Sequence, residues 1–229
     1  SGSTTEAGGT ATFTVNLNSQ PSANVSNAIS SSDTTEGTVS PPSIIFTSSN
    51  WSTAKTVTVT GVDDTAADGD IGYTVVLGIA SSVDSNYSGL DPADVSVTNT
   101  DDDTPGITFN STGDNTTESG GSFTLAAKLN SQPSSDVTFA VSSSDTSEGS
   151  VSHSSLTFTS SNWGTTQWVS ITGVDDYLDD GNQNYTVTIG AASSSDSNYY
   201  GTNPDDLSVT NIDDDTAGFT VTTISGVTT

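Results

Sequence analysis

Residues 169–176 read VSITGVDD, and residues 57–64, at an offset of 112, read VTVTGVDD. In both stretches, Val or Ile alternates with Ser or Thr, which is typical of a β-strand with one buried face. Each run ends at a Gly and continues directly into a pair of Asp residues. The same short stretch therefore predicts a β-fold and an acidic loop at one end of it.

The offset of 112 holds along the whole chain without insertion or deletion, and the blocks NSQPS, FTSSNW, DSNY, SVTN and DDDT recur at this spacing. A fixed period marks a tandem array of one structural unit, and about 100 residues is a common domain size. We expect one domain over residues 1–103 and a second over residues 104–215. We expect residues 216–229 to be the first strand of a following repeat or a strand donated to another molecule.

Short alternating runs, separated by clusters of Ser, Asn, Asp, Gly and Pro, predict seven strands in the second repeat and no helix. Seven short strands in a domain of this size are typical of a Greek-key β-sandwich. The predicted fold class is all-β, with two tandem immunoglobulin-like Greek-key β-sandwiches in an extended array. The strands predicted in the second repeat are residues 106–110, 123–129, 137–141, 156–158, 169–171, 185–189 and 207–209.

The first repeat matches six of these strands, but its own first strand is missing, because Ser1 aligns with Gly113, which lies beyond that strand. Residues 216–229 align with the start of the second repeat and place Phe219 and Val221 at a spacing of two. Two interpretations stay open. The chain is a slice of a longer covalent array, or this segment completes the first domain of a neighbouring copy and makes a head-to-tail polymer. The sequence pattern suits both, and we favour the array, because an ordinary covalent repeat needs no special assembly step.

The chain has 28 acidic and two basic residues, with a formal net charge of −26. Such a charge makes nucleic acid and anionic membranes poor partners, and no apolar run approaches the length needed for membrane insertion. The sequence has no Cys, which excludes a disulfide framework and a thiolate nucleophile or metal site. With no nucleophile–base pair in sight, we expect a structural or binding protein and no enzyme.

Successive loops of an antiparallel sandwich alternate between its two ends, and 21 of the 28 acidic residues fall in loops at one end of each domain. Two unit charges at 4 Å repel by about 4 kcal/mol near a protein surface, so such a cluster calls for a cation. Calcium accepts six to eight oxygen ligands in flexible geometry, whereas magnesium keeps its waters. Zinc and copper are disfavoured by the absence of Cys and the single His. We expect Ca²⁺ at the junction between repeats.

The acids of the first repeat follow a definite order: Thr5-Glu6-Ala7-Gly8-Gly9, then residues 57–64 ending in Asp63-Asp64, then Asp68-Gly69-Asp70, then residues 97–100 leading into Asp101-Asp102-Asp103. This pattern resembles the Calx-beta repeat, a cadherin-like calcium-binding module of sodium–calcium exchangers and of large bacterial extracellular and adhesin-type proteins. The resemblance covers nearly all of both repeats. It implies calcium ligands at Glu6, Asp63, Asp64, Asp68, Asp70, Asp101, Asp102 and Asp103, and at Glu118, Asp175, Asp176, Asp180, Asp213, Asp214 and Asp215.

The second repeat departs from this pattern, because Asn182 stands where the first repeat has Asp70, and the family usually has Glu at Asp68 and Asp70. Asp179 is a candidate to compensate for the lost acid. Asp33 and Asp145 lie in acidic loops at the same end of their domains and complete the candidate ligands.

The main functional prediction is a calcium-stiffened structural or adhesive repeat module of a long extracellular protein or filament, located outside the cell or at its surface. Its partners would be neighbouring repeats of the same chain or head-to-tail copies of itself. The alternative is a calcium-dependent module that binds a surface glycan or protein through loops at the domain ends. We expect Tyr87, Tyr199 and Tyr200, in the long loop before the last strand of each repeat, to pack against the adjoining domain.

Overall fold

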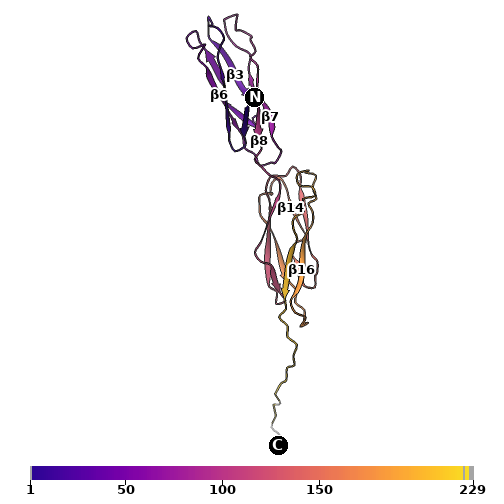
Figure 1. Cartoon of the computed structure of the whole chain (residues 1–229). Helices are drawn as coiled ribbons and strands as arrows, with labels where there is room; N and C mark the ends of the chain where they lie inside the picture. Colours follow the sequence, from indigo (N-terminus) through magenta and orange to yellow (C-terminus); the bar gives the residue numbers. More distant parts are fainter. Residues whose placement is uncertain (1, 224, 227–229) are drawn as a thin grey trace. The chain divides into compact units, whose positions relative to one another are not determined.

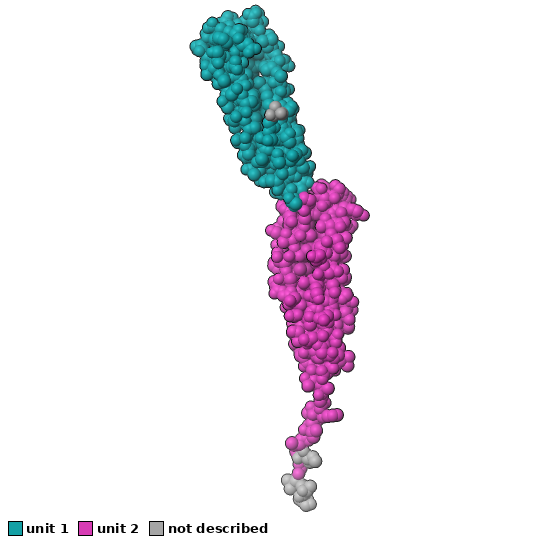
Figure 2. Space-filling model, viewed as in Figure 1, with its two compact units in different colours: residues 1–104 teal, residues 105–229 magenta. Residues whose placement is uncertain are grey.

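The structure is a computed structural model and describes residues 2–223, 225 and 226. The chain divides into two compact units, Ser1–Thr104 and Pro105–Thr229, which are coloured separately in Figure 2. All seventeen regular elements of the described residues are β-strands, and these residues contain no helix with the length and apolarity needed to cross a membrane. The fold is all-β with two tandem β-sandwiches, as the strand pattern predicts.

Unit 1 has eight strands in two sheets (Figure 1). One sheet has five strands in the order β1-β8-β7-β3-β5, and the other has three in the order β2-β6-β4. The strands are β1 (Gly2–Thr5), β2 (Thr10–Val15), β3 (Val25–Ser31), β4 (Gly37–Ser40), β5 (Ser43–Phe46), β6 (Lys55–Gly61), β7 (Ile71–Leu77) and β8 (Val95–Thr100).

Unit 2 has nine strands in two sheets. The five-stranded sheet has the order β10-β17-β16-β12-β14, and the four-stranded sheet has the order β13-β15-β11-β9. The strands are β9 (Ile107–Ser111), β10 (Asn115–Thr117), β11 (Ser122–Leu129), β12 (Val137–Ser143), β13 (Gly149–Val151), β14 (Ser155–Phe158), β15 (Gln167–Gly173), β16 (Gln183–Ile189) and β17 (Leu207–Ile212).

The start of each repeat differs from the single strand predicted there. In unit 2 the chain forms β9 in one sheet and then crosses to the other sheet as β10, which runs parallel to β17. Unit 1 has the counterpart of β10, since β1 pairs with β8 in the same parallel way. The described part of unit 1 has no counterpart of β9. Only the first half of this region is therefore missing from the first repeat.

Alternating residues of the strands fill the core of each unit. In β6, Val57 and Val59 are buried, whereas Thr56, Thr58 and Thr60, which alternate with them, are partly or fully exposed. In unit 2, Phe139 packs edge-to-face against Phe109 and Phe158, with ring centroids 6.2 and 6.4 Å apart. Burying one such side chain contributes about 1.5–3 kcal/mol, so each sandwich has an apolar core of its own.

The tyrosines of the long loops do not pack as predicted. Tyr199 is 1% exposed and belongs to the core of its own unit. Its hydroxyl donates to the carbonyl of Ser131 at 2.7 Å and accepts from the Ser131 N–H at 3.2 Å. Tyr87 packs against the core of unit 1, and Tyr200 is exposed. The predicted packing of Tyr87 and Tyr199 against an adjoining domain is wrong, because the loop turns each ring back into its own sandwich.

Candidate metal sites

Strand pairing brings the acidic loops of unit 1 to one end of its sandwich. Since β1 is parallel to β8, Glu6 after β1 and Asp101 after β8 leave their strands at the same end. In the other sheet, β4 and β6 are antiparallel with Gly37 opposite Gly61, so Glu36 before β4 lies beside the loop that follows β6. The Gly61 N–H donates to the Gly9 carbonyl at 3.0 Å, which extends the pairing of β2 with β6 to the turn that connects β1 with β2.

The Gly of the TGVDD motif has a steric role at this end. A Cβ atom on Gly61 would overlap the carbonyl oxygen of Thr5, and a Cβ on Gly173 would overlap that of Thr117. Only Gly therefore lets the end of β6 or β15 approach the other sheet closely enough to bring the acidic loops together.

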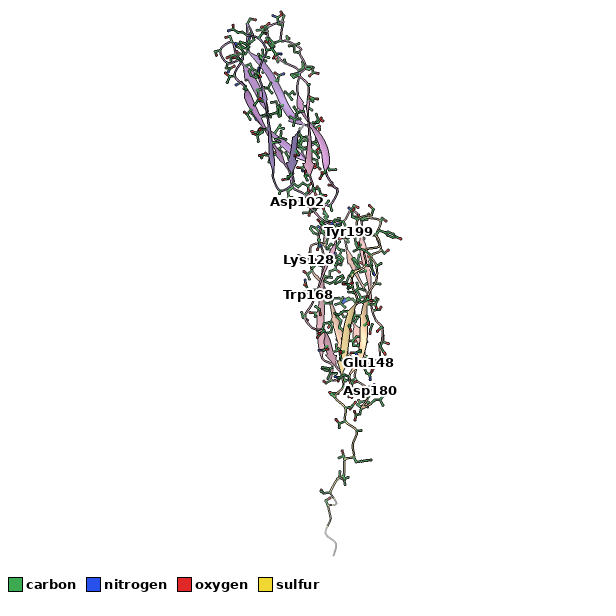
Figure 3. All side chains as sticks on the ribbon, in the orientation of Figure 1. Asp102, Lys128, Glu148, Trp168, Asp180 and Tyr199 are labelled. Carbon is green, nitrogen blue, oxygen red and sulfur yellow. The ribbon has the colours of Figure 1, made fainter. Side chains whose placement is uncertain are left out.

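The carboxylates form two clusters in each unit. Within each cluster, one carboxylate oxygen from each of three residues lies within 4.8 Å of the others. Figure 3 labels Glu148 and Asp180 of one cluster at one end of unit 2, with Tyr199 at the opposite end. We name each cluster after its Glu: the Glu6 cluster (Glu6, Asp101, Asp103), the Glu36 cluster (Glu36, Asp64, Asp68), the Glu118 cluster (Glu118, Asp213, Asp215) and the Glu148 cluster (Glu148, Asp176, Asp180).

Two of the clusters contain buried carboxylate oxygens without a hydrogen-bond partner. Glu6 is 1% exposed and Glu118 is 2% exposed. The Oε2 atom of each is unpaired, as is the Oδ2 atom of Asp103 and of Asp215. A buried charge left without a partner costs several kcal/mol. The two basic residues of the chain cannot balance the acids of all four clusters, so the unpaired oxygens point to a cation from solution.

The pKa values of these carboxyl groups reflect the same cost. Burial, together with the charges of Asp101 and Asp64, raises the pKa of Glu6 to about 7. In unit 2, burial raises the pKa of Glu118 and of Asp215, and neighbouring aspartates add to both shifts. A raised carboxyl pKa means that the ionised form is disfavoured where it stands. A bound cation would supply the missing compensation.

A buried Asn contacts the Glu36 cluster of unit 1 through hydrogen bonds. Asn99 Nδ2 donates to the Val62 carbonyl at 3.0 Å and lies 3.4 Å from Glu36 Oε2, while Asn99 Oδ1 accepts from the Thr4 hydroxyl at 2.9 Å. Asn211 makes the corresponding hydrogen bonds in unit 2. In each unit, one buried Asn therefore connects the Glu of one cluster to the Thr that lies two residues before the Glu of the other cluster.

Glu36 and Glu148 are site residues that the sequence reasoning did not select as ligands, although it placed them at the correct end. One signal could have identified them. The chain has only four Glu residues, and they form two pairs at the repeat offset, Glu6 with Glu118 and Glu36 with Glu148. Each of these Glu residues lies directly next to a strand, after β1 or β10 or before β4 or β13.

The side chains of Asp70 and Asn182, at equivalent positions of the two units, each accept a hydrogen bond from a backbone N–H. Asp70 Oδ1 accepts from the Asp101 N–H at 3.2 Å, and Asn182 Oδ1 accepts from the Asp213 N–H at the same distance. An amide oxygen, like a carboxylate oxygen, can accept this hydrogen bond. The departure of the second repeat from the family pattern therefore leaves the loop geometry intact, and neither residue belongs to a cluster.

Asp33 and Asp145 have local partners. Hydrogen bonds from the side chain and backbone N–H of Thr35 hold the pKa of Asp33 below its usual value, and Ser147 acts in the same way on Asp145. The predicted ligands brought together in the clusters are Glu6, Asp64, Asp68, Asp101, Asp103, Glu118, Asp176, Asp180, Asp213 and Asp215. Those placed outside the clusters are Asp33, Asp63, Asp70, Asp102, Asp145, Asp175, Asp179 and Asp214.

No protein-family model matches the sequence, and a search of curated proteins finds no match. Among solved structures, the chain is similar to the calcium binding domain CBD12 of CALX1.1, with 17% identity over 83% of this chain and 77% of that chain and a TM-score of 0.37. It is also similar to domains 4 and 5 of the S-layer protein SbsC, with 14% identity over 82% and 70% and a TM-score of 0.33. A third match is the YadV chaperone, with 8% identity over 91% and 94% and a TM-score of 0.31. The family resemblance inferred from the sequence stays a prediction.

Proposed function

We propose that this chain is a structural repeat module that binds Ca²⁺ through the two carboxylate clusters of each unit. The observation that supports this most is the pair of buried glutamates, Glu6 and Glu118, each with an unpaired carboxylate oxygen beside two aspartates. Folding brings these charges together without a protein cation to balance them. A divalent ion converts an unfavourable cluster into a site that stabilises the fold.

The donor set favours calcium among the divalent ions. All four clusters consist of carboxylates, which suit a hard cation. The clusters lie in loops that can add backbone carbonyls and water, and calcium accepts such mixed and irregular ligand sets. Magnesium requires near-ideal octahedral geometry and dehydrates reluctantly, which fits a buried glutamate poorly.

Bound calcium would also stiffen the chain between the units. Asp101 and Asp103 of the Glu6 cluster lie just before the short connection Thr104-Pro105-Gly106 that leads into β9. An ion held by both aspartates would anchor the last residues before this connection, and Pro105 already restricts the backbone there. Repeats joined in this way suit a long extracellular or cell-surface filament, where calcium modules with affinities of about 10⁻⁴–10⁻³ M operate.

Thermal unfolding with calcium and with chelator tests ion binding. A ligand that binds only the folded state adds about 2.7 kcal/mol at 100 times its Kd, so calcium should raise the Tm of the wild-type chain clearly. The Glu6→Gln/Glu118→Gln variant should lose much of this increase. The control Asp91→Asn/Asp136→Asn removes one exposed charge from each unit outside the clusters and should respond like the wild type. A wild-type Tm that is the same in calcium and in chelator would overturn the proposal.

Small-angle X-ray scattering tests the stiffening separately. The scattering profile should indicate a narrow range of particle dimensions in calcium and a broader range in chelator. Since Asp103→Asn removes a ligand next to the connection, this variant should remain variable even in calcium. Profiles that do not change with calcium, in a protein whose Tm does change, would leave ion binding intact and reject the mechanical role.

A further inference from the structure

Unit 2 has an exposed aromatic side chain on the outer face of one sheet, where unit 1 has a small polar one. Trp168 of β15 is 54% exposed, and Thr56 stands at the equivalent position of β6. The cross-strand neighbour of Trp168 on β11 is Ala126, which replaces Thr14 of unit 1. The next outward pair along the same strands consists of Ser or Thr in both units. The difference between the units is therefore confined to one part of this face.

The stability of the sheet does not explain this pair of changes. An exposed Trp leaves apolar surface in water, and Ala is depleted in strands, where Thr is enriched. The two changes lie side by side on neighbouring strands. The short methyl group of Ala126 leaves free the space beside the indole that a longer side chain would occupy. Together the two residues form a groove, which points to a ligand.

This groove, which we call the Trp168 groove, has a volume of about 310 Å³, and its lining residues include Thr108, Asn110, Ala126, Lys128, Thr166 and Trp168. Ala126 pairs with Trp168 on one side and with Asn110 of β9 on the other. Ala126 is only 8% exposed, whereas Trp168 and Asn110 are exposed, so Ala126 lies at the bottom between two longer side chains. Pockets for small ligands begin at about 300 Å³, so the groove has room for one ring of a ligand.

The groove combines the aromatic ring with polar groups that can bind hydroxyls. The side-chain amide of Asn110 can both donate and accept hydrogen bonds. The Thr108 hydroxyl donates to Asn130 Oδ1 at 2.7 Å, so its oxygen can still accept. Asn110 lies two strand spacings from Trp168, about 9–10 Å between backbones. A ring that packs on the indole can therefore reach the amide with its substituents.

Lys128 gives the groove a positive charge. It is one of the two basic residues of the chain, it is exposed, and unit 1 has Asn16 in its place. None of the lining residues is acidic, although the chain has 28 acidic residues. Figure 3 labels Lys128 and Trp168 along one side of unit 2, and Glu148 and Asp180 at the end that carries the carboxylate clusters. Since charges beyond about 8 Å are screened at about 0.15 M salt, an anionic group in the groove interacts mainly with the Lys128 ammonium.

We propose that the Trp168 groove binds a carboxylate-bearing pyranose unit of a glycan. The apolar C–H face of the sugar ring packs on the indole, whose face carries a partial negative charge. The sugar carboxylate accepts hydrogen bonds from the Lys128 ammonium, and the sugar hydroxyls pair with Asn110 and Thr108. Unit 2 then has a ligand site on a sheet face, separate from the carboxylate clusters at its end.

A sugar fits this surface better than a protein partner does. A stable protein interface buries about 800 Å² per partner around an apolar core. Here the apolar area is limited to one indole and one methyl group, and the outward residues beside them are Thr112, Thr124 and Ser170. A pyranose has the matching composition, with one apolar ring face surrounded by hydroxyls.

Saturation-transfer difference NMR of the 229-residue chain in chelator tests binding. The probes are oligomers of galacturonate and of glucuronate, and sialyllactose, each measured beside its neutral counterpart: oligomers of galactose and of glucose, and lactose. At least one acidic probe should show transfer at up to about 10 mM, since a contact with a single ring is weak, and its neutral counterpart should show less. No transfer to any acidic probe, or equal transfer to the neutral counterparts, would overturn the proposal.

Variants that give unit 2 the residues of unit 1 locate the site. Trp168→Thr should weaken binding of the acidic probe at least about tenfold, as the loss of an aromatic anchor does, whereas Trp168→Phe keeps a ring and should keep part of the affinity. Because Trp168 is exposed, the Tm of both variants should stay close to that of the wild type. Binding that Trp168→Thr leaves unchanged would refute the proposal.

A second variant tests the role of the charge. Lys128→Asn should lower the affinity for the acidic probe by up to about fivefold, the range of an exposed ion pair, and leave that for the neutral counterpart unchanged. The control Lys55→Gln removes the other positive charge of the chain and gives unit 1 the residue that unit 2 has there. It should bind like the wild type. Equal losses in the two Lys variants would mean that Lys128 has no specific contact with the carboxylate and would overturn its assignment.

Chelator separates this inference from the proposed calcium function, because a calcium ion could bridge an acidic sugar to the carboxylate clusters. The groove contains no cluster residue, so binding should persist in chelator and in Glu6→Gln/Glu118→Gln, whether or not calcium changes the Tm. Binding that requires calcium would assign the sugar to the clusters and overturn the proposal. Sedimentation velocity gives a last check: dimers that Trp168→Thr abolishes would make this face an interface between copies of the chain and refute the glycan site.

Discussion

Units 1 and 2 share their acidic end and differ at one sheet edge. Both have two carboxylate clusters at equivalent positions and the same buried Asn between them. They differ in β9, which only unit 2 has within the described chain, and in the residue at one core position, Asn27 or Phe139. The end that we propose to bind calcium is therefore built in the same way in both units, and β9 is not needed to form it.

The comparison also shows that burial is not set by the residue alone. Phe13 of β2 and Leu125 of β11 occupy equivalent positions in the repeat, yet only Leu125 is buried. The missing neighbour accounts for this contrast, because a strand's side chains are covered by the strands on both sides. The less covered unit should also be the less stable one, and substitutions at paired positions can measure the difference.

The largest expected effect comes from truncating the core where the units differ. Phe139→Ala removes a fully buried ring that packs on Phe109 and Phe158 and should destabilise unit 2 by about 3–5 kcal/mol. Asn27→Ala removes one hydrogen bond, from Asn27 Nδ2 to the Gly78 carbonyl, and should cost about 0.5–1.5 kcal/mol. Scanning calorimetry at fixed calcium concentration should show the two changes in different transitions.

This prediction fails if both substitutions affect the same transition or have similar costs. Such a result would mean that the two sandwiches unfold as one cooperative unit, and the difference at the edge would then have no separate thermodynamic consequence. Urea titration, with the unfolding of each unit followed separately, gives an independent measure of the same difference.

The next effect is a pH dependence that reverses with calcium. Without metal, burial raises the pKa of Glu6 in the folded chain to about 7 from its ordinary value of 4.5. The folded state then binds more protons than the unfolded state between these values. Stability therefore rises as the pH falls through 7 towards 4.5. With calcium bound, protons compete with the ion, and stability should fall over the same range.

Thermal melts in chelator from about pH 8 to about pH 5 measure this slope. Glu6→Gln should flatten the part of the slope that belongs to unit 1, and Glu118→Gln the corresponding part for unit 2, because burial also raises the pKa of Glu118. A Tm in chelator that falls steadily as the pH is lowered through this range would contradict this prediction. It would mean that the ionised carboxylates of Glu6 and Glu118 do not destabilise the metal-free fold.

A smaller difference is expected at the tyrosines. Tyr199→Phe leaves the N–H and carbonyl of buried Ser131 without their partner and should cost about 1–3 kcal/mol. Tyr87 makes the equivalent hydrogen bond to the Ser19 carbonyl at 2.6 Å, but Tyr87 is only half-buried and Ser19 is exposed, so water can replace the hydroxyl. Tyr87→Phe should cost less than half as much in a denaturant titration. Equal costs would mean that water does not replace the Tyr87 hydroxyl at the Ser19 carbonyl.

Much of the fold can be predicted from the alternation of apolar and polar residues along the sequence. The strands that this alternation does not predict were missed for a physical reason. The Val and Thr alternation of β6 predicts its strand and its buried face. Strands β1 and β10 are not predicted as separate strands, because their inward-facing residues, Thr4 and Thr116, are polar and give no hydrophobic period. Each of these Thr side chains is buried and donates a hydrogen bond to an Asn. Strands β4 and β13 are only four and three residues long, too short for a period to be visible.

The sequence predicts which loops form the candidate site, but it does not predict which carboxylate oxygens meet there. The repeat pattern places the acids at the correct end, because strand direction alone decides that. Which carboxylates meet within 4.8 Å depends on loop conformation. Asp101 lies in a cluster partly because the Gly69 N–H holds its Oδ2 at 2.7 Å, whereas Asp33 turns to Thr35. Hydrogen bonds of this kind leave no periodic signal in a sequence.

The smallest expected effect tests whether Asp70 is a ligand, as the family resemblance implies, or a loop support, as its contact with the Asp101 N–H indicates. Asp70→Asn gives unit 1 the residue that unit 2 has at this position. Since an amide oxygen preserves that hydrogen bond, we expect a change in stability within about 0.5 kcal/mol and an unchanged calcium affinity by isothermal titration. Asp64→Asn, which removes a member of the Glu36 cluster, is the control and should weaken binding. If Asp70→Asn weakens calcium binding as much as Asp64→Asn does, Asp70 is a ligand, and unit 2 must then hold its calcium with one carboxylate fewer.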